Sequence, residues 1–169
     1  QPEPKGIAQA LLIAEDFLNG DACTLILGDN LFYGNGVEKG LRSAIKAQRA
    51  TVFSYPVKDA HRYGVVRFDT HGKAVDIIEK PQLPPSNRAV TGLYVYPAEV
   101  VQIAKNLTPS SRGELEITDV NREFLEAGKL SVVELSSSDL WLDTGTVESL
   151  YQATDYVRAL EDRTGAKLG

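Results

Sequence analysis

The sequence predicts an α/β fold: a doubly wound, mostly parallel, Rossmann-like sheet covered by helices, with a β-hairpin beside it. Three observations point to this class. Short apolar runs lack polar alternation, helical periodicities separate these runs, and near residue 64 the pattern changes to two strands joined by a Gly-containing turn. The 169 residues contain no internal repeat or linker, so we expect one domain over 1–169.

The first third of the chain alternates helix and strand. Helical apolar spacing over 7–18 ends at Asn19-Gly20, and the apolar run 23–27 suits a strand that is buried on both faces of a parallel sheet. Residues 37–48 return to helical spacing, and 51–57 form a second β-rich run. This order favours right-handed βαβ units.

The rest of the chain begins with the hairpin, whose two strands we expect at 64–68 and 74–78. The remaining expected elements are a loop at 81–87, strands at 90–96, 130–135 and 140–142, and helices at 97–104, 117–127 and 146–163. The alternation of the two kinds of element supports a sheet with helical layers.

Composition excludes several classes of protein. The net charge of −5, without a block of Lys or Arg, argues against nucleic-acid binding. The longest apolar stretch is far below the roughly 20 residues that cross a bilayer, so we expect no membrane segment. Cys23 is the only cysteine, which excludes a disulfide framework and a Cys-based zinc site and suits a reducing, cytoplasmic compartment. The chain has no methionine, even at position 1, so we expect that residue 1 is not the natural start.

Two aspartates follow predicted strands. Asp29 lies just beyond the carboxyl end of the strand 23–27, where α/β sheets bind ligands, and its carboxylate suits Mg²⁺. Asp143 ends a short strand, and Thr146 after it is a candidate N-cap. The alternatives are an ordinary Gly-Asp-Asn turn at Asp29 and a purely local cap at Asp143.

Two further segments carry polar candidates. Glu79-Lys80-Pro81 offers a carboxylate for sugar hydroxyls and an ammonium for a phosphate, or else is a solvated pair on an edge strand. The acidic run from Arg112 to Asp119 opens a helix, and its alternative role is to cap that helix and complement its dipole. Tyr63, Tyr94 and Trp141 are ring faces for a sugar or members of the core.

Six motifs, taken in order, closely resemble one family. They are Gly28-Asp-Asn30, Arg62-Tyr-Gly-Val65, Glu79-Lys-Pro81, Val90-Thr-Gly-Leu-Tyr94, Gly113-Glu-Leu-Glu-Ile-Thr-Asp119 and Trp141-Leu-Asp-Thr-Gly-Thr146. The family is the sugar nucleotidyltransferases, and within it the glucose-1-phosphate thymidylyltransferases, also called dTDP-glucose pyrophosphorylases. The resemblance implies the nucleotide-diphospho-sugar transferase fold, and a reaction in which dTTP and glucose 1-phosphate give dTDP-glucose and pyrophosphate.

The resemblance also implies roles for individual residues. Asp29 and Asp143 match the two Mg²⁺ carboxylates, Glu79 the acceptor of a sugar hydroxyl, and Lys80 the group that meets the sugar phosphate; Asp29, Lys80 and Asp143 are therefore the expected catalytic residues. Further expected substrate-binding residues are Gln1, Gly6, Asn30, Tyr63, Gly64, Val90, Tyr94, Glu116, Thr118 and Trp141. The family also implies a homotetramer, with a second nucleotide site to which 33–35 would contribute, and a place in dTDP-rhamnose and polysaccharide biosynthesis.

The chain departs from the family at its ends. The Gly-Gly-x-Gly-Thr-Arg-Leu loop, which wraps the triphosphate, and the last helical segment are absent from 1–169. We therefore expect an incomplete domain that carries the sugar and metal sites and is inactive alone. The alternatives are a pyrophosphorylase for another nucleotide sugar, and a non-catalytic module that binds a sugar phosphate or regulates another protein.

Overall fold

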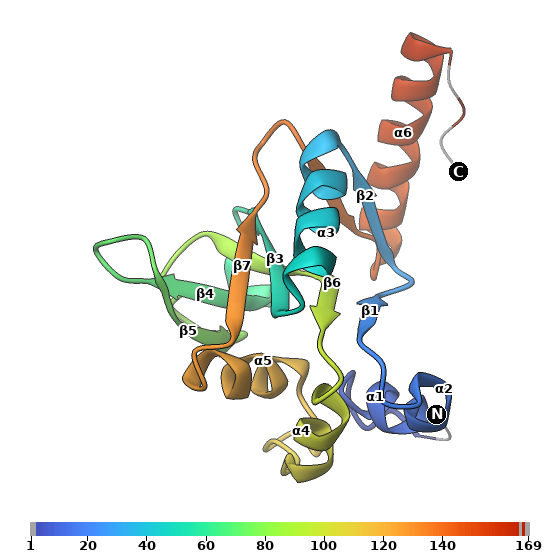
Figure 1. The fold of residues 1–169 in the computed structure, drawn as a ribbon. Coiled ribbons are helices and arrows are strands. Elements are labelled where there is room, and N and C mark those ends of the chain that lie inside the picture. The colour runs from blue at the N-terminus through green and yellow to red at the C-terminus, as the bar shows by residue number, and fades with distance from the viewer. Residues whose placement is uncertain (1–2, 166, 168–169) are drawn as a thin grey trace.

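The computed structural model describes residues 3–165 and 167 and has a mixed α/β fold (Figure 1). Its helices are α1 (Gln9–Ile13), α2 (Glu15–Leu18), α3 (Asn35–Ala47), α4 (Val100–Asn106), α5 (Ile117–Glu126) and α6 (Val147–Thr164), with a short 3₁₀ turn η1 at Ala60–Arg62. Its strands are β1 (Cys23–Ile26), β2 (Asn30–Tyr33), β3 (Ala50–Pro56), β4 (Gly64–Phe68), β5 (Ala74–Glu79), β6 (Arg88–Tyr96), β7 (Leu130–Glu134) and β8 (Leu140–Asp143).

The strands form one main sheet and one small ribbon. The main sheet has the order β5-β4-β6-β3-β7, and β1 pairs with the end of β6 beyond its contact with β4. β2 and β8 pair with each other to form the ribbon. In Figure 1, α6 runs beside this ribbon, on the opposite side of the molecule from the β4–β5 hairpin. Among the described residues, no helix has the length and apolar character needed to cross a membrane.

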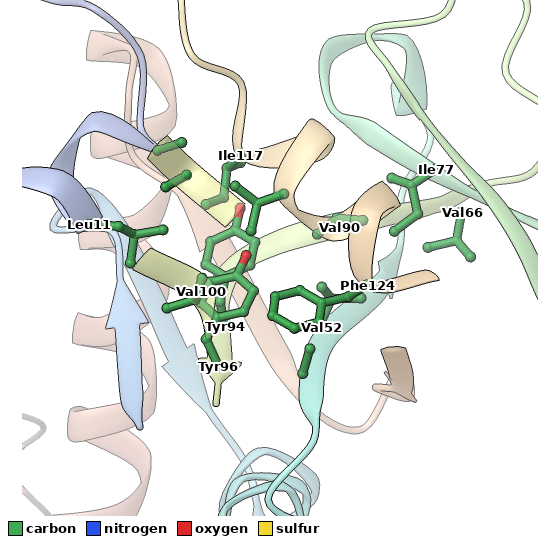
Figure 2. Close-up of a cluster of buried hydrophobic side chains, with 14 residues drawn as sticks. Leu11, Val52, Val66, Ile77, Val90, Tyr94, Tyr96, Val100, Ile117 and Phe124 are labelled. Atoms are coloured by element: carbon green, nitrogen blue, oxygen red, sulfur yellow. The ribbon is translucent and has the colours of Figure 1, made fainter. Parts of the chain in front are cut away.

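Helices cover both faces of the main sheet, as the predicted α/β class requires. On one face, Tyr94 and Tyr96 of β6 stack with ring centroids 5.8 Å apart, and Tyr96 stacks on Phe124 of α5 at the same separation. Figure 2 shows these rings among the apolar side chains of β3, β6, α4 and α5. On the other face, Phe53 of β3 packs in a second cluster with Ala44 of α3. The core therefore fixes β6 between two helical layers.

Three local expectations were wrong. The expected helix over 7–18 is two short helices that meet at Ala14, and no glycine or proline marks the break. β1 was expected between parallel neighbours, but it pairs antiparallel with β6 and alternates between half-buried and exposed positions. Among the pairings of the described strands, only β3–β7 is parallel. β2 was not expected at all: the alternative of a turn at Gly28-Asp29 is present, but a strand follows it directly from Asn30.

Asp139 connects the loop before β8 to the beginning of α3. Its carboxylate accepts hydrogen bonds from the backbone N–H of Gly36 at 2.8 Å and from the backbone N–H and hydroxyl of Ser136, each at 3.1 Å. Burial alone would raise the pKa of Asp139, but these hydrogen bonds outweigh it and lower the pKa below its usual value. The ionised side chain thus holds the β7–β8 loop against α3.

We expect Asp139→Ala to lower the free energy of unfolding at pH 7 by about 1–3 kcal/mol, because the part-buried N–H donors of Gly36 and Ser136 lose their acceptor. Since the folded pKa is lowered, the carboxylate's contribution is complete above the unfolded pKa of about 3.9 and is lost as the pH falls through the folded value. Urea unfolding of the unchanged protein and of Asp139→Ala, at pH 7 and at pH 3, measures how this contribution to the free energy of unfolding depends on pH. Equal effects of the substitution at both pH values would contradict it.

Candidate functional site

A pocket of about 280 Å³ opens where the β2–β8 ribbon meets the start of β4, the end of β5, the middle of β6 and the start of α5. The expected site residues that line it are Asp29, Asn30, Tyr63, Gly64, Glu79, Lys80, Val90, Tyr94, Glu116, Thr118, Trp141 and Asp143. Segments more than 100 residues apart in the sequence therefore meet in one concave surface.

The pairing of β2 with β8 brings the two aspartates together. Asn30 lies opposite Asp143 in the register, and the backbone carbonyl of Asp29 accepts hydrogen bonds from the N–H and the hydroxyl of Thr144 at 2.7 and 2.8 Å. A Cβ atom placed on Gly145 would lie 3.0 Å from Oδ1 of Asp143 and 3.3 Å from Oδ2 of Asp29. The two carboxylates therefore converge beside Gly145, where a larger residue would crowd them.

Asn30 ties this acidic pair to the main sheet. Its Oδ1 accepts hydrogen bonds from the backbone N–H of Gly92 at 3.0 Å and from Nε1 of Trp141 at 2.6 Å, and its Nδ2 donates to Oδ1 of Asp29 at 2.8 Å. The two donors fix the orientation of the amide, so Nδ2 must face the carboxylate. Asn30 therefore positions the side chain of Asp29 as well as the indole.

Glu79 is held at the other side of the pocket. Oγ1 of Thr118 donates a hydrogen bond to Oε2 of Glu79 at 2.6 Å, and Gly64 lies opposite Glu79 in the β4–β5 register. A Cβ atom on Gly64 would approach Oγ1 of Thr118 to 3.0 Å. The glycine therefore leaves the free lone pairs of this carboxylate open to the pocket.

Lys80 leaves β5 in an unusual conformation. Its φ is +42°, and its backbone N–H donates to the carbonyl of Tyr63 at 3.0 Å. Nζ of Lys80 lies 4.0 Å from Oε1 of Glu79. A residue other than glycine with positive φ is uncommon and costs free energy, and such strain clusters at functional sites. The backbone thus directs the ammonium to the pocket at the end of the strand.

Arg112 and Glu116 form the closest ion pair among the described residues of the pocket. NH2 of Arg112 lies 2.8 Å from both carboxylate oxygens of the buried Glu116, and Ser110 Oγ donates to the same group at 2.7 Å. The hydrogen bond to Glu116 raises the pKa of Arg112. Glu116 is the N-cap residue of α5 but its side chain makes no capping bond, so the capping alternative is wrong for this residue. NH2 of Arg112 also lies 3.5 Å from Oε1 of Glu79.

Aromatic rings form the wall near the aspartates. Trp141 and Tyr63 meet edge to face with centroids 5.1 Å apart. Burial, together with the charge of Asp143 and a hydrogen bond to it, raises the pKa of Tyr63. Tyr94 is both a pocket residue and a core residue, and burial strongly raises the pKa of its hydroxyl. Both phenols therefore stay protonated at neutral pH and act as hydrogen-bond donors or apolar surface.

The remaining expected residues have different outcomes. Gly6 does not line the pocket; its φ is +94°, and a Cβ there would come within 2.3 Å of the carbonyl oxygen of Leu115. Gln1 lies outside the described residues. The hydroxyl of Thr146 accepts from the N–H of Ser149, so Thr146 caps α6 as expected. Asp143 lines the pocket, and its Oδ1 also accepts a local hydrogen bond from the N–H of Gly145 at 3.0 Å.

Several pocket residues had not been assigned a role from the sequence: Ile7, Leu27, Arg62, Thr91, Gly92, Arg112, Glu114 and Ile117. Arg62, Thr91, Gly92, Glu114 and Ile117 lie within motifs that carry the resemblance, and Leu27 and Arg112 each lie next to one, so this position was the available signal for them. Ile7 lies outside the six motifs and had no such signal.

The two aspartates suit a hard cation with an incomplete set of protein ligands. Among the described residues, no group of three or more His, Cys, Asp or Glu side chains could hold a metal ion by itself. Mg²⁺ is commonly held by one or two carboxylates, with water and substrate phosphates as its other ligands. The convergence of Asp29 and Asp143 at Gly145 therefore fits a metal that binds together with a phosphorylated ligand.

The mixed α/β fold and this acidic, polar pocket at its strand ends define a nucleotidyltransferase architecture. The sequence model of the family described as "Nucleotidyl transferase" matches residues 1–159, and the chain belongs to this family. It is 50% identical over 169 residues to the glucose-1-phosphate thymidylyltransferase of Xanthomonas campestris, and 48% identical over 169 residues to that of Mycolicibacterium smegmatis. These alignments cover 99% and 100% of this chain but only 57% and 59% of the two relatives.

Solved structures agree with the family. A crystal structure from Bacillus anthracis, assigned to the glucose-1-phosphate thymidylyltransferases and containing a sucrose, is 41% identical with a TM-score of 0.79; the match covers 90% of this chain and 61% of that one. A UDP-glucose pyrophosphorylase complexed with UDP-glucose is 24% identical with a TM-score of 0.82, covers 93% of this chain and 63% of that one, and supports the fold alone. The predicted α/β nucleotidyltransferase fold is thus confirmed.

Proposed function

We propose that the protein transfers the thymidylyl group of dTTP to glucose 1-phosphate, which yields dTDP-glucose and pyrophosphate. One observation carries the proposal: a carboxylate pair suited to a metal shares a small pocket with a carboxylate and an ammonium suited to a sugar phosphate. The printed names of the relatives from Xanthomonas and Mycolicibacterium support the choice of thymidine and glucose.

The pocket offers complementary groups to glucose 1-phosphate. Glu79, fixed by Thr118, has lone pairs that accept hydrogen bonds from sugar hydroxyls. Lys80 offers a cation to the phosphate, and the edge-to-face pair of Tyr63 and Trp141 provides an apolar wall for the ring. Glucose therefore binds between the β4–β5 hairpin and the β2–β8 ribbon, with its phosphate directed at the two aspartates.

The chemistry needs no nucleophilic side chain. A phosphate oxygen of glucose 1-phosphate attacks the α-phosphorus of dTTP, the new P–O bond forms, and the bond to the bridging oxygen of the leaving pyrophosphate breaks. The attacking phosphate is already anionic, so no general base is required, and the protein contributes alignment and charge stabilisation. Asp29 and Asp143 would hold a divalent cation, which we assign as Mg²⁺, and this cation neutralises phosphate charge when bound.

We further propose that residues 1–169 are the sugar- and metal-binding portion of the transferase. The Gly-rich triphosphate loop that the family resemblance implies does not occur in this sequence. We therefore expect the isolated 169 residues to show little turnover of dTTP with glucose 1-phosphate and Mg²⁺. Rapid dTDP-glucose formation by the isolated chain would contradict the proposal that residues 1–169 are only the sugar- and metal-binding portion. A cytoplasmic location, a homotetramer and a place in dTDP-rhamnose biosynthesis belong to the same proposal.

A comparison of the four nucleoside triphosphates tests the choice of nucleotide. The complete enzyme is assayed with glucose 1-phosphate, Mg²⁺ and dTTP, UTP, CTP or GTP, with pyrophosphate release as the readout. We expect kcat/KM to be highest with dTTP. A higher value with another triphosphate would identify a different pyrophosphorylase. Binding of glucose 1-phosphate without turnover of any triphosphate would identify a non-catalytic module.

A further inference from the structure

Three of the described residues that line the pocket are cations, and they are engaged to different degrees. Arg112 contacts three carboxylates, those of Glu79, Glu114 and Glu116. Lys80 lies at the same side of the pocket, near Glu79. The third cation, Arg62, lies beside the aspartate pair. Among the described residues its one ion-pair partner is Asp143, with NH2 of Arg62 4.0 Å from Oδ2 of Asp143.

The local fold holds Arg62 at this position. It is the last residue of η1, and its guanidinium carbon lies 5.4 Å from the ring centroid of Tyr63, within the range of a cation–π contact. The hydroxyl of Tyr63 is hydrogen-bonded to Asp143. Arg62 and Tyr63 therefore meet the same carboxylate from one side. The Arg62 side chain is 43% exposed, so a ligand in the pocket can reach it.

We propose that Arg62 shares Asp143 with the divalent cation and binds a phosphoryl oxygen of the ligand once that cation is in place. This inference rests on the proposed function. A divalent cation held by Asp143 would neutralise the carboxylate and repel the guanidinium of Arg62, so Arg62 would lose its ion-pair partner at 4.0 Å. The planar fork of arginine matches a phosphate with two parallel N–H donors, and arginine stays charged at every working pH.

The two roles predict opposite effects of one substitution. Arg62→Gln removes a cation that competes for Asp143, so a metal ion without phosphate should bind about two- to fivefold more tightly, as expected for a partly exposed ion pair. The same substitution removes charge-assisted hydrogen bonds to the phosphate, so glucose 1-phosphate should bind at least about tenfold more weakly at saturating metal. A purely structural role would weaken both interactions together.

Two titrations of the purified 169-residue chain measure these effects. Mn²⁺, which takes the same oxygen ligands as Mg²⁺, is titrated alone and followed by electron paramagnetic resonance. Glucose 1-phosphate is then titrated at saturating Mg²⁺ by calorimetry. The matched control is Arg67→Gln, because Arg67 lies on β4, pairs with Asp76 at 3.4 Å and does not line the pocket. Thermal melting of each variant shows that it is folded.

Arg62→Lys adds a second distinction. It keeps the charge but loses the fork, so we expect Mn²⁺ affinity close to that of the unchanged protein and glucose 1-phosphate affinity between those of the protein and Arg62→Gln. Weaker Mn²⁺ binding by Arg62→Gln, or unchanged affinity for glucose 1-phosphate, would overturn the inference. If the unchanged protein binds Mn²⁺ but no glucose 1-phosphate, the proposed function and the phosphate role of Arg62 are both wrong, and the Mn²⁺ titration still measures its contact with Asp143.

Discussion

Replacement of Asp29 or Asp143 with asparagine is expected to slow dTDP-glucose formation by the complete enzyme at least about 100-fold, the scale of lost transition-state electrostatics. Asparagine keeps the shape of the side chain and removes the charge that a divalent cation requires. The two carboxylates converge at Gly145, so each substitution disrupts the same site. The rate of pyrophosphate release at saturating substrates and Mg²⁺ measures the loss.

A matched control and a double variant sharpen this prediction. Asp21 is exposed, precedes β1 and does not line the pocket, so Asp21→Asn should leave the rate unchanged. Asp29 and Asp143 would act through one cation. The rate of the double variant should therefore fall by far less than the product of the fold-decreases in rate of the two single variants. Near-normal rates in either single variant would remove that aspartate from the metal site, and multiplicative losses would contradict a shared cation.

Replacement of Lys80 with methionine is expected to weaken glucose 1-phosphate binding at least about tenfold and to lower the turnover rate about 100-fold. Methionine keeps the length and apolar stem of the side chain and removes only the ammonium. The backbone at φ +42° and its hydrogen bond to Tyr63 are unaffected by this choice, so the change is confined to charge.

The measurements for Lys80 are a binding titration with glucose 1-phosphate and a turnover assay with dTTP. Lys58→Met is the matched control, since Lys58 is exposed and does not line the pocket. A normal affinity for glucose 1-phosphate in Lys80→Met would show that this ammonium does not meet the sugar phosphate. A loss of affinity for glucose itself, without its phosphate, would show that Lys80 acts on the sugar ring.

Periodicity predicted most elements because their patterns are local. The hairpin of β4 and β5, the long apolar β6 and the amphipathic α5 lie close to their expected ranges. β1 lies where it was expected, but an apolar run determines neither the direction of its neighbour nor burial on both faces: β1 pairs antiparallel with β6, and every second residue is exposed. β2 was missed because a four-residue strand after Gly28-Asp29 has no pattern of its own; its partner β8 lies more than 100 residues along the chain.

The site was predictable as a set of residues but not as a geometry. The motifs named Asp29, Glu79, Lys80 and Asp143, and one pocket contains all four. The sequence could not show that Asn30 joins Asp29, Gly92 and Trp141 through one amide, since these partners come together only in the folded sheet. The acidic run near Glu116 is also locally ambiguous, because a carboxylate before a helix serves equally as a cap or as the partner of Arg112.

The most direct test of the central claim, that a sugar phosphate and a divalent cation share this pocket, is a titration of the chain with glucose 1-phosphate followed by tryptophan fluorescence. Trp141 is the only tryptophan in the sequence, is buried and lines the pocket, so its emission reports on this site. We predict a saturable change in emission whose apparent Kd falls at least about tenfold when Mg²⁺ is added. An emission that does not respond to glucose 1-phosphate, or an affinity indifferent to Mg²⁺, would contradict the claim.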